Sequence, residues 1–208
     1  MATVTPNYSW PVPTSTDLVK DGATAIEALG DAIDATVFGL PGSGLTLINT
    51  TTFSAVASQS VNDVFSATYE DYKIMVNITS VSADAQIFLK LRTGGTDSSA
   101  SYYYAVQGLT ALNAGFNDAQ NNVSTGWSMT AADSGTNNIY AFNGDIMKPF
   151  LAVPTKLTCL STGSTTGGTP GFNNGGGVHL VSTSYSSLSI IPVTGTFSGS
   201  VKIYGYSQ

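Results

Sequence analysis

The chain has 208 residues, of which 42% are hydrophobic and only 10% are charged, and its formal net charge is −6. Ordinary soluble proteins carry about 25% charged residues, so Ser, Thr, Asn and Gly must supply most of this surface, as in extracellular or virion-exposed β-proteins. The hydrophobic content suffices for a folded core. No basic face is offered to a phosphate backbone, and no apolar run approaches the ~20 residues of a membrane span. We therefore expect a folded protein that neither binds nucleic acid nor inserts into a membrane.

The first 13 residues contain three prolines and two aromatic residues, Tyr8 and Trp10. Pro6, Pro11 and Pro13 exclude a helix and predict an arm that runs extended. Two exposed aromatic rings on such an arm need a hydrophobic surface to dock on. That surface belongs either to a partner molecule, which we favour, or to the chain itself.

The next segment, roughly Asp17–Phe38, has the pattern of a single amphipathic helix. Ser15 or Thr16 can cap its first free amides, and Gly39 and Pro41 end it. The apolar side repeats at coiled-coil-like spacing and consists of Val19, Ile26, Leu29 and Ile33, completed by Gly22 and Thr36.

A helix of this length is marginal alone in water, and burying each Ile or Leu side chain contributes about 1.5–3 kcal/mol. The helix therefore needs a partner, either other copies of the chain or its own sheet. By heptad rules alone, Ile and Leu in these positions slightly favour a dimer. We interpret residues 1–40 as an anchoring arm followed by an oligomerisation helix, a coiled-coil-like stalk.

After a short linker the pattern changes to strand-like alternation, with clusters of Gly, Asn, Ser and Thr between the strands. Residues 45–208 are therefore predicted to form an antiparallel, jelly-roll-like β-sandwich of about ten strands. The predicted strands are Leu45–Thr50, Ser60–Ser66, Tyr72–Ile78, Gln86–Arg92, Ser101–Leu109, Gly126–Thr130, Asn138–Met147, Thr155–Ser161, Gly177–Ser182, Ser187–Ile191 and Gly199–Tyr206.

Two segments interrupt this rhythm. The stretch from Ser161 to Gly177 is rich in glycine, and we expect a long loop there. The stretch from Asn113 to Thr125 is polar and contains one large aromatic residue, Phe116.

The sequence offers little for catalysis. His179 is the only histidine and has no neighbouring His or Cys, which argues against a zinc site, and no Gly-x-Ser-x-Gly elbow accompanies it. The acidic residues beyond residue 45 lie mostly in turn-like contexts and single out no pair for glycoside hydrolysis. Cys159 lies in a strand-like pattern, where we expect a buried thiol. We predict no enzyme activity, no cofactor and no metal.

Recognition remains as a function for the domain. Aromatic rings stack on sugars and amide side chains bond their hydroxyls, so a chain with few charges can bind neutral glycans. The alternative is that these aromatic residues simply fill the core or cover the outer face. The candidate glycan contacts are Tyr103, Phe116, Trp127 and Phe172.

Three stretches follow one another near the N-terminus: Pro6–Pro13, Asp17–Ala23 and Ile26–Asp34. In this order they resemble the N-terminal module of many tailed-phage structural proteins, usually called minor tail proteins or tail fibres. More loosely, Ser60–Ser66 and the ending Gly199–Tyr206 resemble phage fibre-type β-domains. Such proteins are typically trimeric, with an N-terminal anchor to the particle and a distal domain that can contact the host.

The resemblance implies a virion protein that forms a homotrimer and attaches through its arm, by Tyr8 and Trp10, to another virion protein of the tail or capsid. Its sandwich would then bind host-surface glycan. A capsid-surface head fibre or decoration protein without a receptor role uses the same design, and the short chain keeps that alternative open. A depolymerase spike is disfavoured, because neither a β-helix repeat nor a carboxylate pair emerges.

Overall fold

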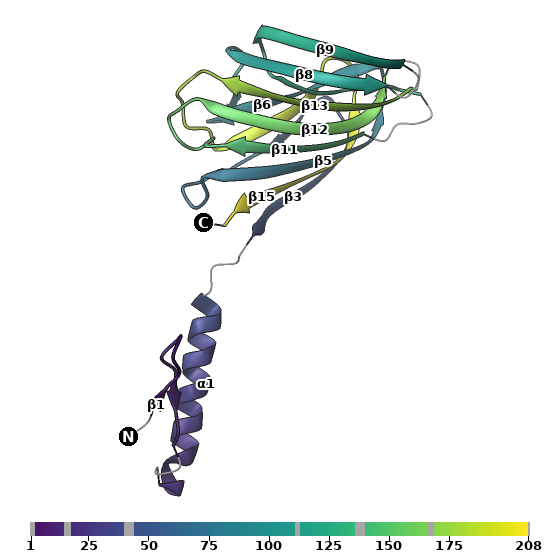
Figure 1. The fold of residues 1–208 in the computed structure, drawn as a ribbon. Coiled ribbons are helices and arrows are strands. Elements are labelled where there is room, and N and C mark those ends of the chain that lie inside the picture. Colours follow the sequence, from purple (N-terminus) through teal and green to yellow (C-terminus); the bar gives the residue numbers. More distant parts are fainter. Residues whose placement is uncertain are drawn as a thin grey trace. The chain divides into compact units, whose positions relative to one another are not determined.

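The computed structural model describes residues 3–14, 18–39, 44–110, 113–135, 140–165 and 169–207. The chain forms two compact units, Met1–Ser43 and Gly44–Gln208. The boundary expected between residues 40 and 45 falls at the same place. Each unit has its own internal packing, shown in Figure 1.

The N-terminal unit consists of a hairpin arm and one helix. The strands β1 (Thr3–Val4) and β2 (Pro11–Val12) pair antiparallel, and the 3-10 turn η1 (Val19–Asp21) leads into the helix α1 (Gly22–Gly39). Figure 1 shows the arm lying along the helix. The predicted helix is therefore present, while its predicted caps, Ser15 and Thr16, lie outside the described residues.

The prediction that the arm runs extended is wrong, because the chain turns back between Thr5 and Trp10. The amide of Thr5 donates to the carbonyl of Trp10, and the amide of Ser9 donates to the carbonyl of Thr5, both at 3.0 Å. Ser9 has a positive φ of 56°, which the turn requires. Prolines exclude a helix here, but they are compatible with such a turn.

The β-domain is a sandwich of two antiparallel sheets, as predicted, and Figure 1 shows the larger sheet in front of the smaller one. Its strands are β3 (Leu45–Val56), β4 (Gln59–Val61), β5 (Asp71–Val81), β6 (Ala85–Thr93), β7 (Thr96–Asp97), β8 (Tyr102–Thr110), β9 (Asn113–Ser124), β10 (Trp127–Ala132), β11 (Tyr140–Met147), β12 (Thr155–Thr165), β13 (Thr169–His179), β14 (Ser187–Pro192) and β15 (Phe197–Tyr206). The large sheet has the order β3-β15-β5-β11-β12-β13-β8-β9, and the small sheet has the order β10-β6-β14-β4, with β7 paired to β6.

Strands of the first half of the domain pair with strands of the second half in reverse order. β3 pairs with β15, β4 with β14, β5 with β11, and β6 with β10. A long hairpin rolled up in this way is a jelly roll of two four-stranded sheets. Strands β12, β13, β8 and β9 then extend the large sheet on one side. The predicted jelly-roll-like fold is confirmed.

The core lies between the sheets and follows the alternation seen in the sequence. On β5, the side chains of Tyr72, Ile74, Val76 and Ile78 point inward and are each at most 3% exposed. Burial of each such side chain stabilises the fold by about 1.5–3 kcal/mol. Cys159 is buried as expected, and burial raises the pKa of its thiol to about 11, so the thiolate needed for reactivity is scarce at neutral pH.

The prediction of a long loop from Ser161 to Gly177 is wrong. β12 and β13 form a hairpin over most of it, paired from Thr155 opposite His179 to Thr165 opposite Thr169. At Gly177 a Cβ atom would lie 2.5 Å from the carbonyl oxygen of Tyr103 and 2.7 Å from the ring of Trp127. Glycine is needed here because another backbone and a ring approach closely, and not because the chain is flexible.

The polar stretch at 113–125 is likewise mostly a strand, β9, which pairs with β8 at the edge of the large sheet. Its pairing is irregular, with register shifts at both ends of β8. The sequence pattern did not predict this strand, because its alternation of apolar and polar residues is weak.

Replacing Gly177 with alanine should destabilise the β-domain, because the added methyl group would meet the Tyr103 carbonyl and the Trp127 ring. Overpacking of this kind lowers the free energy of unfolding by about 1–3 kcal/mol. Urea denaturation followed by circular dichroism measures the loss. The exposed residue Asn77 gives a control, since Asn77→Ala should change stability by less than ~0.5 kcal/mol. A Gly177→Ala variant as stable as the control would contradict the close packing.

Candidate functional site

The aromatic arm docks on its own helix through Trp10. The indole Nε1–H donates to the Thr36 hydroxyl at 2.9 Å, and that hydroxyl donates to the carbonyl of Ala32 at 2.8 Å. The ring of Tyr8 stacks on Trp10 with centroids 5.2 Å apart and planes 18° apart. Tyr8 stays 57% exposed, so one aromatic ring of the arm remains open to a partner. Anchoring of a particle by Tyr8 and Trp10 stays a prediction.

The helix has two apolar sides, one that faces the arm and one that does not. The side that carries Thr36 is half-buried, and it includes Gly22, Ala25, Leu29 and Ala32. Leu29, which was assigned to the oligomerisation seam with Val19, Ile26 and Ile33, therefore lies on the side that meets the arm.

A second apolar side of the helix stays open. Val19 is 97% exposed, Ile26 is 65% exposed and Val37 is 59% exposed, while Gly30 has open space around it. Successive members of this side are alternately four and three residues apart, which is the spacing of a coiled-coil seam. We call it the helix stripe; it consists of Val19, Ala23, Ile26, Gly30, Ile33 and Val37, of which Ile33 is half-buried and the others are exposed.

Trp127 is wrongly assigned as a glycan contact. Its side chain is completely buried and packs edge-on against Tyr102, with centroids 5.1 Å apart. The residue begins β10 and points into the core, so no sugar can reach its ring. In the sequence it stands next to a polar turn, which suggested exposure, but the inward side of the strand decides its position.

The other three glycan candidates lie on the large sheet. The side chain of Phe116 lies outside the described part of the chain. Tyr103 is half-buried and Phe172 is 42% exposed, both on the outer face. Tyr103 pairs with Val178 in register, six residues along β13 from Phe172, which puts them about 20 Å apart. Tyr103 and Phe172 therefore do not form one site.

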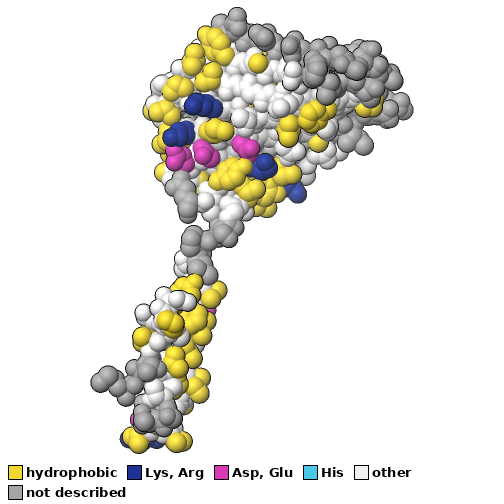
Figure 2. Space-filling model, viewed as in Figure 1, with side chains coloured by type: hydrophobic (Ala, Val, Ile, Leu, Met, Phe, Trp, Pro, Cys, Tyr) yellow, Lys and Arg dark blue, Asp and Glu magenta, His cyan; other side chains and the backbone are white. Residues whose placement is uncertain are grey.

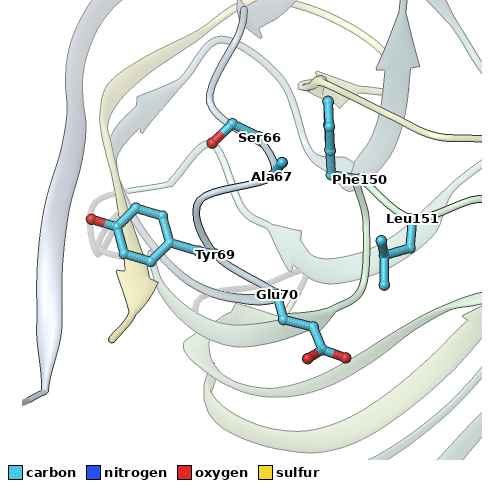
Figure 3. A pocket seen from close by; sticks show the side chains of 6 residues that line it. All are labelled: Ser66, Ala67, Tyr69, Glu70, Phe150 and Leu151. Carbon is cyan, nitrogen blue, oxygen red and sulfur yellow. The ribbon is translucent and has the colours of Figure 1, made fainter. Parts of the chain in front are cut away.

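Charged side chains gather in a place that the sequence did not single out. A hollow of about 500 Å³ is formed at one end of the large sheet by Asp71, Met147, Lys148, Leu151, Val153, Pro154 and Lys156. A smaller one of about 230 Å³ shares Leu151 with it. The walls of the smaller hollow come from two segments far apart in sequence, residues 66–70 and 150–151, as Figure 3 shows. In this view the side chain of Tyr69 points away from Phe150. No local motif could have revealed such a site.

Four of the charged side chains at this end form two ion pairs. Lys148 Nζ lies 2.8 Å from a carboxylate oxygen of Glu70, and its hydrogen bond to Glu70 raises the pKa of Lys148. Asp145 pairs with Lys73 at 3.4 Å and accepts a hydrogen bond from the Tyr206 hydroxyl at 2.5 Å, which raises the pKa of Tyr206 to about 12. Figure 2 shows acidic, basic and hydrophobic side chains together at this end of the domain.

His179 lies at the centre of a buried polar cluster. Its Nδ1 is 3.2 Å from the carbonyl of Ser101, and its Nε2 is 2.8 Å from the Tyr185 hydroxyl and 3.1 Å from the Ser98 hydroxyl. Because a carbonyl only accepts, Nδ1 carries the proton and Nε2 accepts. The ring also stacks on Tyr102, with centroids 4.2 Å apart.

The contact between Ser98 and His179 resembles a nucleophile and its base, but its surroundings are structural. Tyr185 competes for the same nitrogen lone pair, and the third partner is a carbonyl where a triad has a carboxylate. The His179 ring is also completely buried. The cluster therefore ties β13 to the loops that carry Ser98 and Tyr185.

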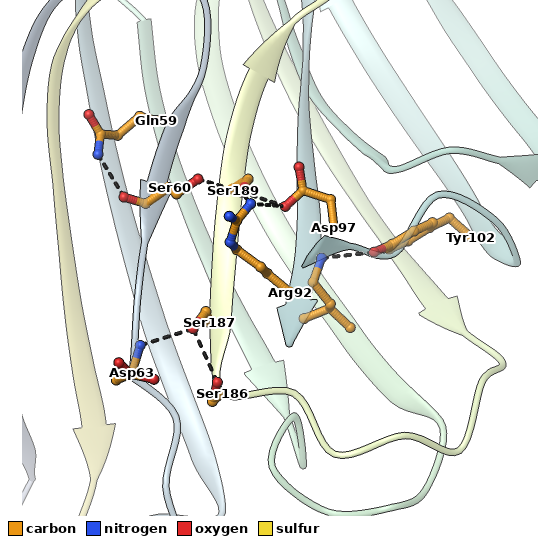
Figure 4. A network of polar contacts seen from close by, with 10 residues as sticks. Gln59, Ser60, Asp63, Arg92, Asp97, Tyr102, Ser186, Ser187 and Ser189 are labelled. Atoms are coloured by element: carbon orange, nitrogen blue, oxygen red, sulfur yellow. Dashed lines mark hydrogen bonds and ion pairs between the residues drawn. The ribbon is translucent and has the colours of Figure 1, made fainter. Parts of the chain in front are cut away.

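The outer face of the small sheet carries a second polar network, drawn in Figure 4. Arg92 donates to Asp97 at 2.8 Å, and the Ser189 hydroxyl donates to the same carboxylate oxygen at 2.7 Å. Ser60 lies 3.1 Å from Ser189. These groups use one another as partners and join β4, β14, β6 and β7, so we assign the network to the stability of the sheet.

No protein-family model matches the chain, and no curated protein matches it significantly. Among the described residues, no helix is long and apolar enough to cross a membrane. The same residues contain no group of three or more His, Cys, Asp or Glu side chains that could hold a metal ion.

Stability should fall as the pH drops below about 6.5, because burial lowers the pKa of His179 from its ordinary value of 6.5. The unfolded chain then binds a proton more readily than the folded one. Stability is fully present above pH ~6.5 and is lost as the pH falls through the lowered pKa, by at most ~1.4 kcal/mol per pH unit.

Urea denaturation of the full chain between about pH 7.5 and 5 measures this slope. His179 is the only histidine, and most carboxylates titrate below this range. The His179→Gln variant serves as the control and should show a flat profile. A flat profile in the unchanged protein would mean that His179 is protonated as easily when folded as when unfolded.

Proposed function

We propose that this chain is a structural protein of a tailed-phage particle. It forms a trimeric fibre that is attached through its N-terminal unit and that presents the β-sandwich to host-surface glycans. The observation that carries the proposal is the helix stripe, an exposed apolar seam on the helix of the N-terminal unit. Such an exposed stripe is unfavourable on an isolated helix in water, because each exposed Ile or Val side chain lacks the free energy that its burial would contribute.

The helix stripe suits self-association of parallel copies. Val19, Ile26 and Ile33 are seven residues apart, so each would meet its equivalent in another copy. Ala23 and Gly30 lie between them and let helices approach closely. The number of copies follows from the resemblance to phage fibres, which favours three.

The arm supports attachment to another virion protein. Trp10 is held by the helix through Thr36, and this bond fixes the position of the exposed Tyr8 ring. A rigid, exposed aromatic ring is a good anchor, because little conformational entropy is lost on binding. The same arrangement would serve a head fibre on the capsid, and the virion protein that binds the arm distinguishes the two.

The chemistry of the sandwich supports binding more than catalysis. In the Ser98–His179 contact the imidazole ring is completely buried, and Lys148 is paired with Glu70. The outer face of the large sheet includes exposed polar side chains, such as those of Asn77, Thr158 and Asn174, which can form hydrogen bonds with hydroxyls.

Ile26→Asp should convert the trimer into a monomer, because it puts a charge in the middle of the helix stripe. Thr24→Asp adds the same charge at an exposed position on the polar side of the same helix, and it should leave the trimer intact. Light scattering gives the mass of both full-length variants. The sandwich should stay folded in each, which circular dichroism checks.

A full-length chain that is monomeric without any substitution would contradict assembly through the helix stripe in solution. A trimer that survives Ile26→Asp would assign assembly to the sandwich. A truncated chain of residues 44–208 separates these outcomes, since it retains the complete core of the β-domain and should be monomeric under the proposal.

A further inference from the structure

The larger hollow at the end of the large sheet is built from strand ends and from one loop. Three of its lining residues lie on the outer face, at one end of β5, β11 and β12: Asp71, Met147 and Lys156. The other four belong to the segment after β11: Lys148, Leu151, Val153 and Pro154. Its volume of about 500 Å³ lies in the range of small-molecule sites. We call it the loop hollow.

Hydrogen bonds hold the loop wall of the hollow in place. The amide of Lys148 donates to the carbonyl of Glu70 at 3.0 Å and to the carboxylate of Asp71 at 3.2 Å. Further along the loop, the amide of Tyr185 donates to the carbonyl of Pro149 at 2.8 Å. The loop is thus tied both to the start of β5 and to the segment before β14. A preformed wall of this kind lets a ligand bind without first ordering the loop.

The charges around the loop hollow are balanced. Lys148 is paired with Glu70, whereas Asp71 and Lys156 take part in no ion pair within the described part of the chain. Met147 is in register with both of them, which puts their backbones about 10 Å apart on either side of it. One carboxylate and one ammonium group therefore flank the hollow. This arrangement suits a neutral ligand that both donates and accepts hydrogen bonds.

The surface between these two charges is apolar. Leu151 is 43% exposed and Val153 is 38% exposed, while Met147 is half-buried. Such side chains favour a ligand with a methyl group or C–H faces, because its contact removes apolar surface from water. Hydroxyl groups can donate to the Asp71 carboxylate, and a carbonyl oxygen can accept from Lys156. A sugar that carries an N-acetyl group combines all three features.

One of the glycan contacts predicted from the sequence lies on the same row of the outer face. Lys156 is in register with Val178, which is in register with Tyr103. Tyr103 is therefore about 10 Å from Lys156 across two strands. A glycan seated in the loop hollow can extend along this row toward the Tyr103 ring.

We propose that the loop hollow binds a neutral, N-acetylated sugar of a host-surface glycan. Its acetamide methyl group lies against Leu151 and Val153, and its polar groups bond to Asp71 and Lys156. This inference rests on the proposed function and names the site and the class of sugar that the sandwich recognises.

An array of immobilised glycans, in which each N-acetylated hexosamine stands beside its parent hexose in the same linkage, tests the proposal with the full-length chain. We expect binding to the N-acetylated members, reduced roughly tenfold by Asp71→Asn, by Lys156→Ala and by Val153→Ser. Asparagine keeps an oxygen for the Lys148 amide, so the loop wall should stay in place. The controls Lys202→Ala and Val193→Ser change an exposed lysine and an exposed valine outside the hollow, and they should bind as the unchanged chain does.

Four results would overturn the inference: no binding to any glycan, binding to acidic glycans alone, equal binding to N-acetylated and parent sugars, or binding that is undiminished in all three hollow variants. A lower mass for Val153→Ser in light scattering would make the hollow a contact between copies, which also overturns it. Binding that ignores the hollow variants would remove this site and leave a glycan-binding sandwich. Assembly through the helix stripe is tested separately by Ile26→Asp, so a trimer without glycan binding would remove only the receptor role.

Discussion

The large sheet depends on its last strand. β15 lies between β3 and β5 and pairs with both along almost its whole length. β3 is the first strand in the order of the large sheet, where β15 is its neighbour. The side chains of Val201 and Ile203 on β15 are completely buried in the core. Every pairing in the jelly roll, from β3 with β15 to β6 with β10, links residues far apart in sequence. Such long-range pairing makes folding slow, but it leaves one closed core that holds the outer faces rigid.

Two glycines make this central position of β15 possible. At Gly199 a side chain would collide with the backbone of β5 near Asn77, and at Gly205 it would collide with the ring of Tyr69. Close approach at both ends lets β15 run between its neighbours without spreading them. The Tyr206 hydroxyl then reaches Asp145 on β11, so the end of the chain also orders the charged end of the sheet.

Sequence patterns predict the elements of this protein well where burial dictates them. Alternation locates the strands because one face of each is in the core, as on β5 and β11. Alternation fails at Gly175–Gly177, because the sequence does not distinguish a glycine that close packing requires from a glycine in a flexible loop. It fails at Trp127 because neighbouring polar residues do not tell which way a side chain points.

The candidate sites were harder to predict, for a related reason. The helix pattern shows which residues are apolar but not which of them face the arm. Leu29 lies on the side that meets the arm, whereas Ile26 lies on the helix stripe. The arm itself was predicted to run extended, so this division of the helix surface could not be foreseen. The setting of Tyr103, beside Val178 and about 20 Å from Phe172, depends on register between β8 and β13. Register between strands is decided by tertiary packing, and no spacing within the sequence encodes it.

The low charge of the chain bears on both proposed roles, assembly through the helix stripe and binding by the outer face of the sandwich. A face without net charge gains little from long-range attraction, so its binding must come from many short contacts with a rigid surface. Each such contact is weak, so a single domain would hold a neutral glycan poorly. Presenting several copies of the domain on one stalk raises the effective concentration of the second site once the first has bound, without any new contact. Under the proposed function, the helix stripe would present several copies of a domain whose single binding events are weak.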